Sequence, residues 1–330
     1  MTPADATWRP SATWDTLRAR ARLLGVARAF FAARDILEVD TPAIGRHGVT
    51  EPHIASIGVR LTARPDTPHF LQTSPEYALK RLLATGGPDL YQLGKVFRDG
   101  ELGRLHQPEF TLVEWYRRGI SLDEIIAETC GFIAELMSAG GHGAGPHVER
   151  HAYADLFQAK LAIDPLHAPL AELRAAARQR IGPLTDALAV QLGDDRSAWL
   201  DLLMSHVVIP DLPAAALSVI HHYPAAQAAL ARLDPADPRV AERFEVFYGG
   251  LELANGYREL TDAREQRRRF ARDLQRRETA GAPAMTADPA LLAALEHGLP
   301  DCCGVAVGFD RVVMCALDLD SIEETLSFAL

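Results

Sequence analysis

The stretch FRDGELGRLHQPEFTLVEW, residues 97–115, decides the fold prediction. Its first half carries charges of both signs and is interrupted by Gly100, Gly103 and Pro108, which favours a loop. Its second half is β-branched and aromatic, which favours a strand. Together with LYQLGKVF at 90–97, it predicts two strands joined by a mobile, charged loop. Because so much charge is costly to build for packing alone, we expect the loop to bind a charged ligand.

Length and composition set the class of protein. The chain has 330 residues, of which 48% are apolar and 24% charged, as in soluble globular proteins of one or two domains. The N-terminus MTPADATWRPSATWD lacks the apolar core of a signal peptide, and every apolar run is too short to span a bilayer. Four cysteines have neither metal-ligand nor disulfide spacing, so we expect a reduced, cytoplasmic protein without a membrane partner. The net charge of −10 disfavours broad binding to a polyanion.

Hydrophobic periodicity predicts the elements of the N-terminal part. We expect a flexible tail over residues 1–16 and an amphipathic helix to about residue 34, whose apolar stripe comprises Leu23, Leu24, Ala27, Phe30 and Phe31. ILEVDTP, residues 36–42, predicts a strand, and VRLTARPDTPHFLQT, residues 59–73, a hairpin. TSPEYALKRLLA, residues 73–84, predicts a helix with Ser74 as N-cap, Pro75 in the first helical position and a capping box of Thr73 with Glu76.

The middle of the chain is less informative. Residues 138–150 form a linker rich in glycine and histidine. His142, His147 and His151 suggest a metal site, but flexible glycines do not fix a ligand geometry, and a solvated loop is the preferred interpretation. Residues 151 to about 243 are rich in alanine and leucine, which predicts a mostly helical insertion.

The last hundred residues predict three further elements. FEVFYGGLELANGYREL, residues 244–260, predicts two strands joined at Gly249–Gly250, with Phe247 opposite Glu252 and Glu245 opposite Ala254. The two glutamates then share one face and repel each other unless a cation lies between them. DAREQRRRFARDLQRRE, residues 262–278, predicts a helix capped by Asp262 whose arginines form a solvated face. GVAVGFDRVVMCAL predicts a strand at 304–308 that opens into a helix near Asp310.

The order of these motifs resembles the class II aminoacyl-tRNA synthetases. The first helix and the strand ending at Pro42 resemble their motif 1, FRDGELGRLHQPEFTLVEWY their motif 2, and GVAVGFDRVVM their motif 3. TSPEYALKRLL and GGLELANGYREL are similar to the lysyl-tRNA synthetase subgroup. The resemblance covers residues 17–135 and 240–328. It implies one α+β catalytic domain at 17–330, with a mostly antiparallel sheet flanked by helices and the helical insertion at about 151–243. It also implies a homodimer, because motif 1 forms the dimer interface.

The resemblance implies that the charged loop binds ATP. Arg98 would contact the α-phosphate and the amino-acid carboxylate, and Arg311 the far end of ATP, so both are expected to be catalytic. His106 would contact the terminal phosphates, Phe110 would stack on adenine, and Glu245 and Glu252 would hold Mg²⁺. The residues expected to bind ATP are Arg98, Asp99, Gly100, Glu101, His106, Gln107, Phe110, Glu252, Leu253, Gly308 and Arg311.

The amino acid is expected to be a diamine. Glu114 and Tyr116 are two residues apart on a strand and share a face, where with Glu259 they suit a distal ammonium group. Glu76 matches the residue that binds the amino group nearer the reacting carboxylate. The residues expected to bind the amino acid are Ser74, Pro75, Glu76, Glu114, Tyr116, Asn255, Glu259 and Ala306.

Two departures from the lysyl-tRNA synthetases change the expected reaction. Only 16 residues precede Leu17, too few for their anticodon-binding barrel, and Ala306 replaces the middle glycine of motif 3. Both departures resemble a family of stand-alone paralogues, the ligases that attach (R)-β-lysine to elongation factor P. This resemblance implies a β-lysyl-adenylate, transfer to a lysine of elongation factor P, and no stable binding of tRNA. Asp99–Gly100 and Gln107 differ from the expected Asn-Glu and Asn, which leaves the contacts to the adenine edge open.

Two other functions stay open on the sequence. The enzymatic alternative is a minimal lysyl-tRNA synthetase or a free amino-acid ligase. The non-enzymatic alternative is a regulatory synthetase paralogue, for which a broken set of arginines and acids is expected. Arg98, Glu245, Glu252 and Arg311 are all in place, which disfavours the regulatory paralogue.

Overall fold

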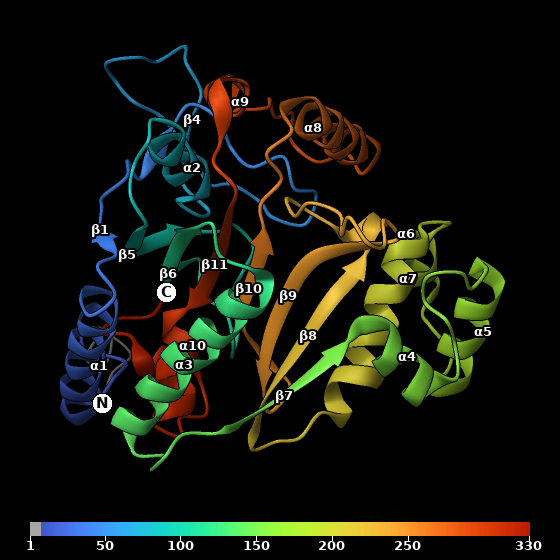
Figure 1. The fold of residues 1–330 in the computed structure, drawn as a ribbon, viewed down its shortest axis with the longest axis horizontal. Coiled ribbons are helices and arrows are strands. Elements are labelled where there is room, and N and C mark those ends of the chain that lie inside the picture. Colours follow the sequence, from blue (N-terminus) through green and yellow to red (C-terminus); the bar gives the residue numbers. More distant parts are fainter. Residues whose placement is uncertain (1–7) are drawn as a thin grey trace. The chain divides into compact units, whose positions relative to one another are not determined.

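Alternation along β6 (Glu109–Arg118) organises the part of the fold that carries the charged loop. The structure, a computed structural model, describes residues 8–330 apart from the side chain of Gln191. The chain divides into two compact units (Figure 1): the chain up to Gly145 together with Glu259–Leu330, and Pro146–Arg258. We refer to them as the first and the second unit and describe each by itself.

The first unit contains a sheet segment of the order β1-β5-β6-β11. β1 (Leu37–Glu38) runs parallel to β5 (Leu90–Phe97), whereas β5, β6 and β11 (Cys302–Gly308) are antiparallel. A separate small sheet has the order β2-β4-β3, formed by β2 (Ile44–Gly45), β3 (Gly58–Val59) and β4 (His69–Leu71). The helices are α1 (Trp14–Ala32), α2 (Glu76–Ala84), α3 (Leu122–Gly140), α8 (Ala263–Thr279), α9 (Pro289–Gly298), α10 (Phe309–Ala316) and a 3₁₀ turn at Ile322–Thr325.

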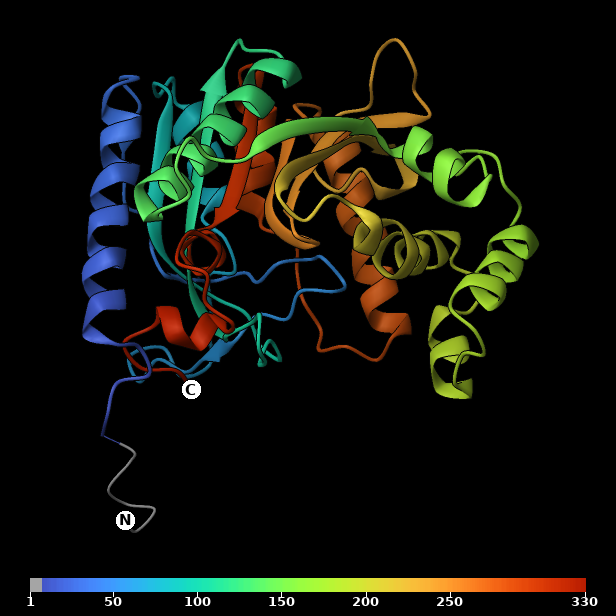
Figure 2. The ribbon, with the colours of Figure 1, turned by 90° about the horizontal axis from the view of Figure 1, so that it is seen from below.

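Aromatic packing separates the two faces of this sheet segment. The ring of Phe31 on α1 stacks on Tyr91 of β5 at 4.1 Å and meets Trp115 of β6 edge-on at 5.3 Å. Phe132 of α3 contacts the same group, and Figure 2 shows α1 running alongside the strands. Odd-numbered side chains of β6 therefore lie under the helices. Since successive side chains of a strand point to opposite faces, the even-numbered residue Glu114 and its neighbours face the other way.

The second unit contains the strand order β10-β9-β8-β7. β7 (His147–Ala152) is parallel to β8 (Ala216–Pro224), and β9 (Val240–Tyr248) is antiparallel to both β8 and β10 (Leu251–Arg258). Its helices are α4 (Tyr153–Leu161), α5 (Leu170–Arg180), α6 (Asp186–Leu192), α7 (Arg196–Leu203), a π turn at Met204–Val208 and 3₁₀ turns at Ile209–Asp211 and Ala225–Gln227. Phe157, Leu200 and Val208 from the helical segments pack with Ile220 of β8 and Phe247 of β9 in one core.

The α+β class with mostly antiparallel pairing flanked by helices is confirmed in each unit. Strand β5 spans 90–97 as expected, β3 and β4 form the expected hairpin, and β11 leads directly into α10. Within residues 8–330, each helix is too short or too polar to cross a bilayer.

The N-terminal expectations need correction. Residues 1–7 lie outside the described residues, but Ser11 and Ala12 donate their amides to the carbonyls of Ser327 and Leu326, so the expected flexible tail does not extend to residue 16. Helix α1 begins at Trp14 because the Thr13 hydroxyl accepts the Thr16 amide as an N-cap. The expected stripe is buried except for Leu24, which is half-buried.

Two other boundaries of the N-terminal part also differ. The strand expected at 36–42 is reduced to Leu37–Glu38. Helix α2 starts at Glu76 rather than Pro75, and Ser74 Oγ accepts the Glu76 amide at 3.0 Å. The Glu76 carboxylate binds Lys80 instead of closing a capping box with Thr73.

The middle of the chain contains more strand than expected. The linker expected at 138–150 is shorter, since α3 reaches Gly140 and β7 begins at His147. The mostly helical character expected for residues 151 to about 243 holds for 153–211, but Ala216–Pro224 forms β8 and β9 begins at Val240. Alternating or continuous runs of alanine and leucine do not distinguish a buried strand from a helix, which explains the error. The extent of the catalytic domain and of its insertion stays a prediction.

Candidate active site

Three predicted residues of the first unit, Ser74, Glu114 and Tyr116, form one hydrogen-bonded group on the even face of β6. Glu114 is 2% exposed; its Oε2 accepts the Ser74 hydroxyl at 2.6 Å and its Oε1 accepts the Tyr116 phenol at 2.8 Å. Ala306 lies directly across from Glu114 in the register of β11, so its methyl group is on the same face. Pro75 is the residue before α2, so Ser74 lies just ahead of the start of this helix. The structure thus brings together residues separated by more than 200 positions in the chain.

Glu76 and Glu259 meet through a residue that the sequence interpretation missed. Lys80 Nζ lies 2.5 Å from Glu76 Oε1 and 2.6 Å from Glu259 Oε2, and the three side chains are buried or nearly so. Glu76 and Lys80 are four residues apart on α2, the spacing at which opposite charges pair on a helix. This spacing could have predicted the contact from the sequence. Burial by itself lowers the pKa of Lys80, but Glu259 and Glu76 together raise it above its ordinary value, so Lys80 remains a cation.

Burial shapes the acidity of this group, which we call the acidic pocket and define by Ser74, Glu76, Lys80, Glu114, Tyr116 and Glu259. Burial and then the charge of Glu76 raise the pKa of Glu114 to about 8, although bonds from Ser74 and Tyr116 oppose the rise. Burial raises the pKa of Glu259 to about 7, and Lys80 opposes that rise. Burial and the Glu114 charge raise the pKa of Tyr116 well above its ordinary value, so it donates as a neutral phenol. Such a group is suited to a ligand that brings positive charge.

Gly304 lets Glu259 and Tyr116 pack directly against β11. It pairs with Tyr116, and a Cβ atom built on it would lie 2.4 Å from both Glu259 Oε1 and Tyr116 Cε1. Within residues 8–330, Glu259 Oε1 has no hydrogen-bond donor although the residue is 1% exposed. A buried carboxylate oxygen in this state is poised to accept a donor from a ligand.

Arg98 lies at the start of the charged loop. Its guanidinium Nη1 is 3.6 Å from Glu101 Oε1, its Nε is 3.4 Å from the Thr73 carbonyl, and its Cζ is 5.1 Å from the centre of the Phe110 ring. The side chain is 25% exposed, so it is accessible to a ligand. Since Thr73 precedes Ser74, the guanidinium lies next to the acidic pocket.

The remaining loop residues shape the backbone. The Asp99 amide bonds to the Ala55 carbonyl, the Asp99 carboxylate accepts the Gly100 amide, and Gly100 has φ = 75°, which a side chain would strain. Gly103 and His106 exchange backbone hydrogen bonds and close the turn. Gln107 is 2% exposed, and its side chain contacts Glu323 and the Leu330 amide, so it faces the C-terminal segment.

A hydrogen bond between Arg311 and His106 connects the start of α10 to the charged loop. Arg311 is in the first turn of α10, after Gly308, and its Nη2 donates to His106 Nε2 at 2.7 Å. Burial and the Arg311 guanidinium lower the pKa of His106, with a further contribution from Arg98. The loop end of β6 and the start of α10 therefore form a cationic surface that contains a neutral histidine.

The predicted metal residues lie on the β9–β10 hairpin of the second unit. Gly249 and Gly250 form the expected turn with φ = 54° and 78°, and Phe247 pairs with Glu252 as expected. Glu245 pairs with Asn255 rather than Ala254, because a β-bulge at Leu253 inserts one residue. The two glutamates still share one face, while Leu253 is buried.

A protein cation already neutralises this face. Glu245 accepts hydrogen bonds from Arg243 and, at 2.6 Å, from the Tyr223 phenol. Glu245 and then Glu252 are among the groups that hold the pKa of Arg243 above its ordinary value, against the effect of burial. The cation expected between the two glutamates is thus at least in part Arg243, a residue two positions from Glu245 that the sequence interpretation did not use.

Other candidate ligands are accounted for by the fold. Within residues 8–330, His, Cys, Asp and Glu side chains form no group of three or more suited to a metal ion. His142 bonds to the Cys315 carbonyl, and His147 and His151 both contact Glu149. The preferred interpretation as a solvated loop is wrong for His147 and His151, which belong to strand β7. Cys130, Cys302, Cys303 and Cys315 are free thiols.

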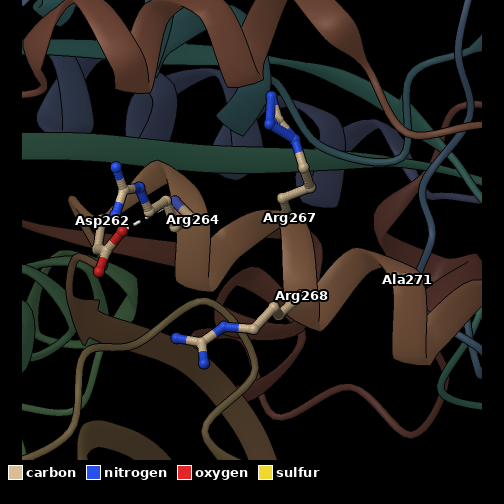
Figure 3. A pocket seen from close by; sticks show the side chains of 5 residues that line it. All are labelled: Asp262, Arg264, Arg267, Arg268 and Ala271. Atoms are coloured by element: carbon tan, nitrogen blue, oxygen red, sulfur yellow. Dashed lines mark hydrogen bonds between the residues drawn. The ribbon is translucent and has the colours of Figure 1, made fainter.

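The arginine-rich helix α8 carries a separate open pocket of about 630 Å³, lined by Asp262, Arg264, Arg267, Arg268 and Ala271. Asp262 caps α8 as expected, and Figure 3 shows the Arg267 and Arg268 guanidinium groups pointing in different directions. The expected solvated face is wrong for Arg269 and Arg277, which are 6% and 4% exposed. Arg277 donates instead to the Glu51 and Ile54 carbonyls.

Comparison with known proteins agrees with this geometry. The family described as tRNA synthetases class II (D, K and N) matches residues 6–330. Proteins named elongation factor P–(R)-β-lysine ligase are similar to the chain along its length. The one from Mannheimia succiniciproducens is 42% identical over 98% of this chain and 97% of its own. The one from Klebsiella pneumoniae (strain 342) is 43% identical over 98% of each. The chain belongs to the class II tRNA synthetase family of the D, K and N type and, within it, to the elongation factor P–(R)-β-lysine ligases.

Proposed function

We propose that this protein activates (R)-β-lysine with ATP and transfers the β-lysyl group to a lysine side chain of elongation factor P. The observation that carries the proposal is the acidic pocket, where Glu114 and Glu259 are buried and have raised pKa values. The names of the similar proteins supply the acceptor and the stereochemistry. The class II synthetase family supplies the use of ATP.

The first step is formation of an adenylate. A carboxylate oxygen of the amino acid attacks the α-phosphorus of ATP, the bond to the β-phosphate breaks, and pyrophosphate leaves. Arg98, next to the acidic pocket, would hold the carboxylate and the α-phosphate and stabilise the charge that develops there. Arg311 would bind the terminal phosphates with the help of the free N–H groups in the first turn of α10.

The second step is amide formation. A deprotonated lysine amine of the acceptor attacks the carbonyl carbon of the β-lysyl-adenylate, and AMP leaves with the electron pair of the mixed anhydride bond. As the amide forms, the attacking nitrogen releases one proton, which the departing AMP phosphate or solvent accepts. Burial and the Arg311 guanidinium lower the pKa of His106, so its neutral imidazole would contact the terminal phosphates through one N–H.

The acidic pocket would position the diamine. Glu114, held by Ser74 and Tyr116, would bind one ammonium group, and Glu259 with Glu76 the other. Burial raises the pKa values of Glu114 and Glu259 in the ligand-free protein, and two ammonium groups would supply the positive charge that lets both carboxyl groups ionise.

We propose Mg²⁺ as the metal cofactor, held by Glu245 and Glu252. Its role would be to neutralise phosphate charge. The fit rests on hard oxygen donors on one face of the hairpin, and on Asn255 Oδ1, which is buried and has no hydrogen-bond partner within residues 8–330.

We also propose a cytoplasmic homodimer without stable binding of tRNA. Helix α1 exposes Trp14 to 70%, and Leu37 of β1 is 51% exposed, which fits a buried subunit contact. The net charge of −10 disfavours tRNA binding. Analytical ultracentrifugation of the wild type and of Trp14→Asp tests the dimer: a wild type that sediments as a monomer would refute it.

The decisive experiment is ATP–pyrophosphate exchange with (R)-β-lysine, α-lysine and a panel of neutral amino acids. We expect exchange with (R)-β-lysine well above that with α-lysine and none with neutral amino acids. Preference for α-lysine would favour a minimal lysyl-tRNA synthetase or a free amino-acid ligase. Absence of exchange with every amino acid would favour a regulatory paralogue.

A further inference from the structure

Lys80 is part of the acidic pocket but has no role in the proposed reaction. The chain has 34 lysines and arginines, and only Lys80, Lys95 and Lys160 are lysines. Lys95 and Lys160 have side chains that are 43% and 33% exposed, whereas the Lys80 side chain is 3% exposed. Most of the positive charge of the chain is therefore on arginine. Lys80 is the one of the three lysines whose side chain is buried.

The geometry explains why the group is an ammonium. One nitrogen atom lies 2.5 Å from Glu76 Oε1 and 2.6 Å from Glu259 Oε2. An ammonium is a compact point charge with three donors, whereas a guanidinium is a planar fork that needs more room. Lys80 therefore joins one carboxylate on α2 to another that follows β10, at a single point.

The acidic pocket contains more acidic than basic groups. Three carboxylates, those of Glu76, Glu114 and Glu259, face one ammonium, that of Lys80. With all four ionised, the pocket carries two negative charges in excess. The other ionisable groups that face Glu259 are the Tyr116 phenol and the Cys302 thiol, and burial raises the pKa of both, so they are neutral.

We propose that Lys80 is a positioning residue that orients Glu76 and Glu259 and opposes protonation of Glu259, so that the pocket accepts an amino acid with two ammonium groups. This inference rests on the proposed function and assigns within it the origin of the selectivity for a diamine. Glu259 offers its second oxygen, Oε1, which has no donor within the described residues, to the ligand while Lys80 holds the first. Lys80 contacts the two glutamates, so it affects binding of the amino acid through them.

The first test is Lys80→Met, which keeps a long unbranched side chain but removes its positive charge. Glu259 then loses the cation that opposes its protonation, and at neutral pH it binds a proton instead of the ligand. We expect KM for (R)-β-lysine to rise about ten-fold or more, as for the loss of a charge-assisted contact, while KM for ATP stays near that of the wild type. The acid limb of kcat/KM for (R)-β-lysine should move up by about one pH unit. Lys160→Met, which removes an exposed lysine, is the matched control and should behave as the wild type.

The second test does not depend on activity. Chemical denaturation at pH 5 and pH 8 gives the free energy of unfolding of the wild type and of Lys80→Met. The difference between the two proteins reports on the charge of the glutamates near Lys80. At pH 5 the variant can protonate Glu259, whereas at pH 8 it must bury carboxylates without their cation, so its loss of stability should be larger at pH 8. A wild type that uses no diamine would refute the proposed function but would leave this difference in place.

Lys80→Arg covers the case in which Lys80→Met does not fold. It keeps the charge but changes the shape, so we expect an acid limb near that of the wild type together with a raised KM for (R)-β-lysine. The inference is overturned if Lys80→Met has the acid limb, KM and pH-dependent stability of the wild type. It is also overturned if Lys80→Arg shifts the acid limb as Lys80→Met does, because the charge would then not be the property that matters.

Discussion

Arg98 and Arg311 are held in place by neighbours whose contacts a phosphate or carboxylate can replace. Arg98 contacts Glu101 at 3.6 Å and the Phe110 ring, and Arg311 donates to His106, a neutral base. The Arg98 side chain is 25% exposed, and Arg311 lies in the first turn of α10. Their positions are therefore suited to binding an anion rather than to stabilising the fold.

At this scale we predict that Arg98→Ala and Arg311→Ala each lower ATP–pyrophosphate exchange by on the order of 10²–10³ or more, because each removes a charged donor to the transition state. Thermal unfolding should show that both variants stay folded. Arg264→Ala, on the exposed helix α8, is the matched control and should keep full exchange. Near-normal exchange in both active-site variants would mean that ATP binds elsewhere.

Glu259 makes a prediction about stability against pH. Its pKa is raised from 4.5 to about 7 in the folded protein, so the folded state retains a proton that the unfolded chain loses. The free energy of unfolding should therefore decrease as the pH rises from about 4.5 to 7. Glu259→Gln removes this titration and should flatten that slope by about 1–3 kcal/mol across the range.

Urea denaturation at pH 4, 5.5 and 7.5 measures the slope. Glu172→Gln, on the exposed face of α5, removes a solvent-exposed carboxylate and is the matched control, which should leave the slope as in the wild type. Equal slopes for Glu259→Gln and the wild type would show that Glu259 is already ionised in the folded protein.

At the scale of the elements, β11 determines how closely side chains approach the acidic pocket. Gly304, Ala306 and Gly308 alternate along it and pair with Tyr116, Glu114 and Leu112 of β6. Gly304 is required by a contact of 2.4 Å that a Cβ would make, while Ala306 adds one methyl group next to Glu114. The strand thus sets the size of the space for the amino acid.

We predict that Ala306→Gly improves the use of α-lysine relative to (R)-β-lysine. One methyl group in a tight pocket shifts a preference by roughly 1–3 kcal/mol, or about 10–200-fold. The ratio of kcat/KM for the two amino acids measures the shift, with KM for ATP as the internal control. An unchanged ratio would show that Ala306 does not contact the substrate.

The β9–β10 hairpin supplies the prediction about metal. Glu252→Gln should raise the Mg²⁺ concentration that gives half-maximal exchange, because it removes one carboxylate from the proposed ligand pair. Glu245→Gln should do so too, but it also weakens the bonds to Arg243 and Tyr223, so a loss of stability is expected with it. Titrations with Mg²⁺ that coincide for both variants and the wild type would refute the metal site.

At the scale of the whole molecule, the charge balance bears on the acceptor. The protein carries a net charge of −10, which gives no general attraction to tRNA, whereas a folded acceptor protein needs only a local surface. We predict that the enzyme modifies elongation factor P and does not charge tRNA at a useful rate.

The experiment incubates the enzyme, ATP and labelled (R)-β-lysine with elongation factor P or with tRNA from the same source. Label on the protein that resists mild alkali is expected, because an amide survives conditions that hydrolyse an ester. Label only on tRNA, lost in mild base, would identify a minimal synthetase. Arg98→Ala in the same assay is the control for label that does not depend on the adenylate.

Local patterns in the sequence were sufficient to predict several elements and the chemistry of the motifs. Strand 90–97, the Gly249–Gly250 turn and the Asp262 cap follow from short-range rules of alternation, glycine conformation and capping. The motif order around Arg98 and Arg311 indicated the class II synthetase family, which the comparisons confirm.

Which side chains meet in the acidic pocket depends on long-range packing. A bulge at Leu253 moved Asn255 opposite Glu245, because one inserted residue shifts every partner beyond it. Lys80 joined Glu259 across 179 positions of the chain, and strand β8 appeared where composition favoured helix. Such contacts depend on register and burial between segments far apart in the chain, which local periodicity does not encode.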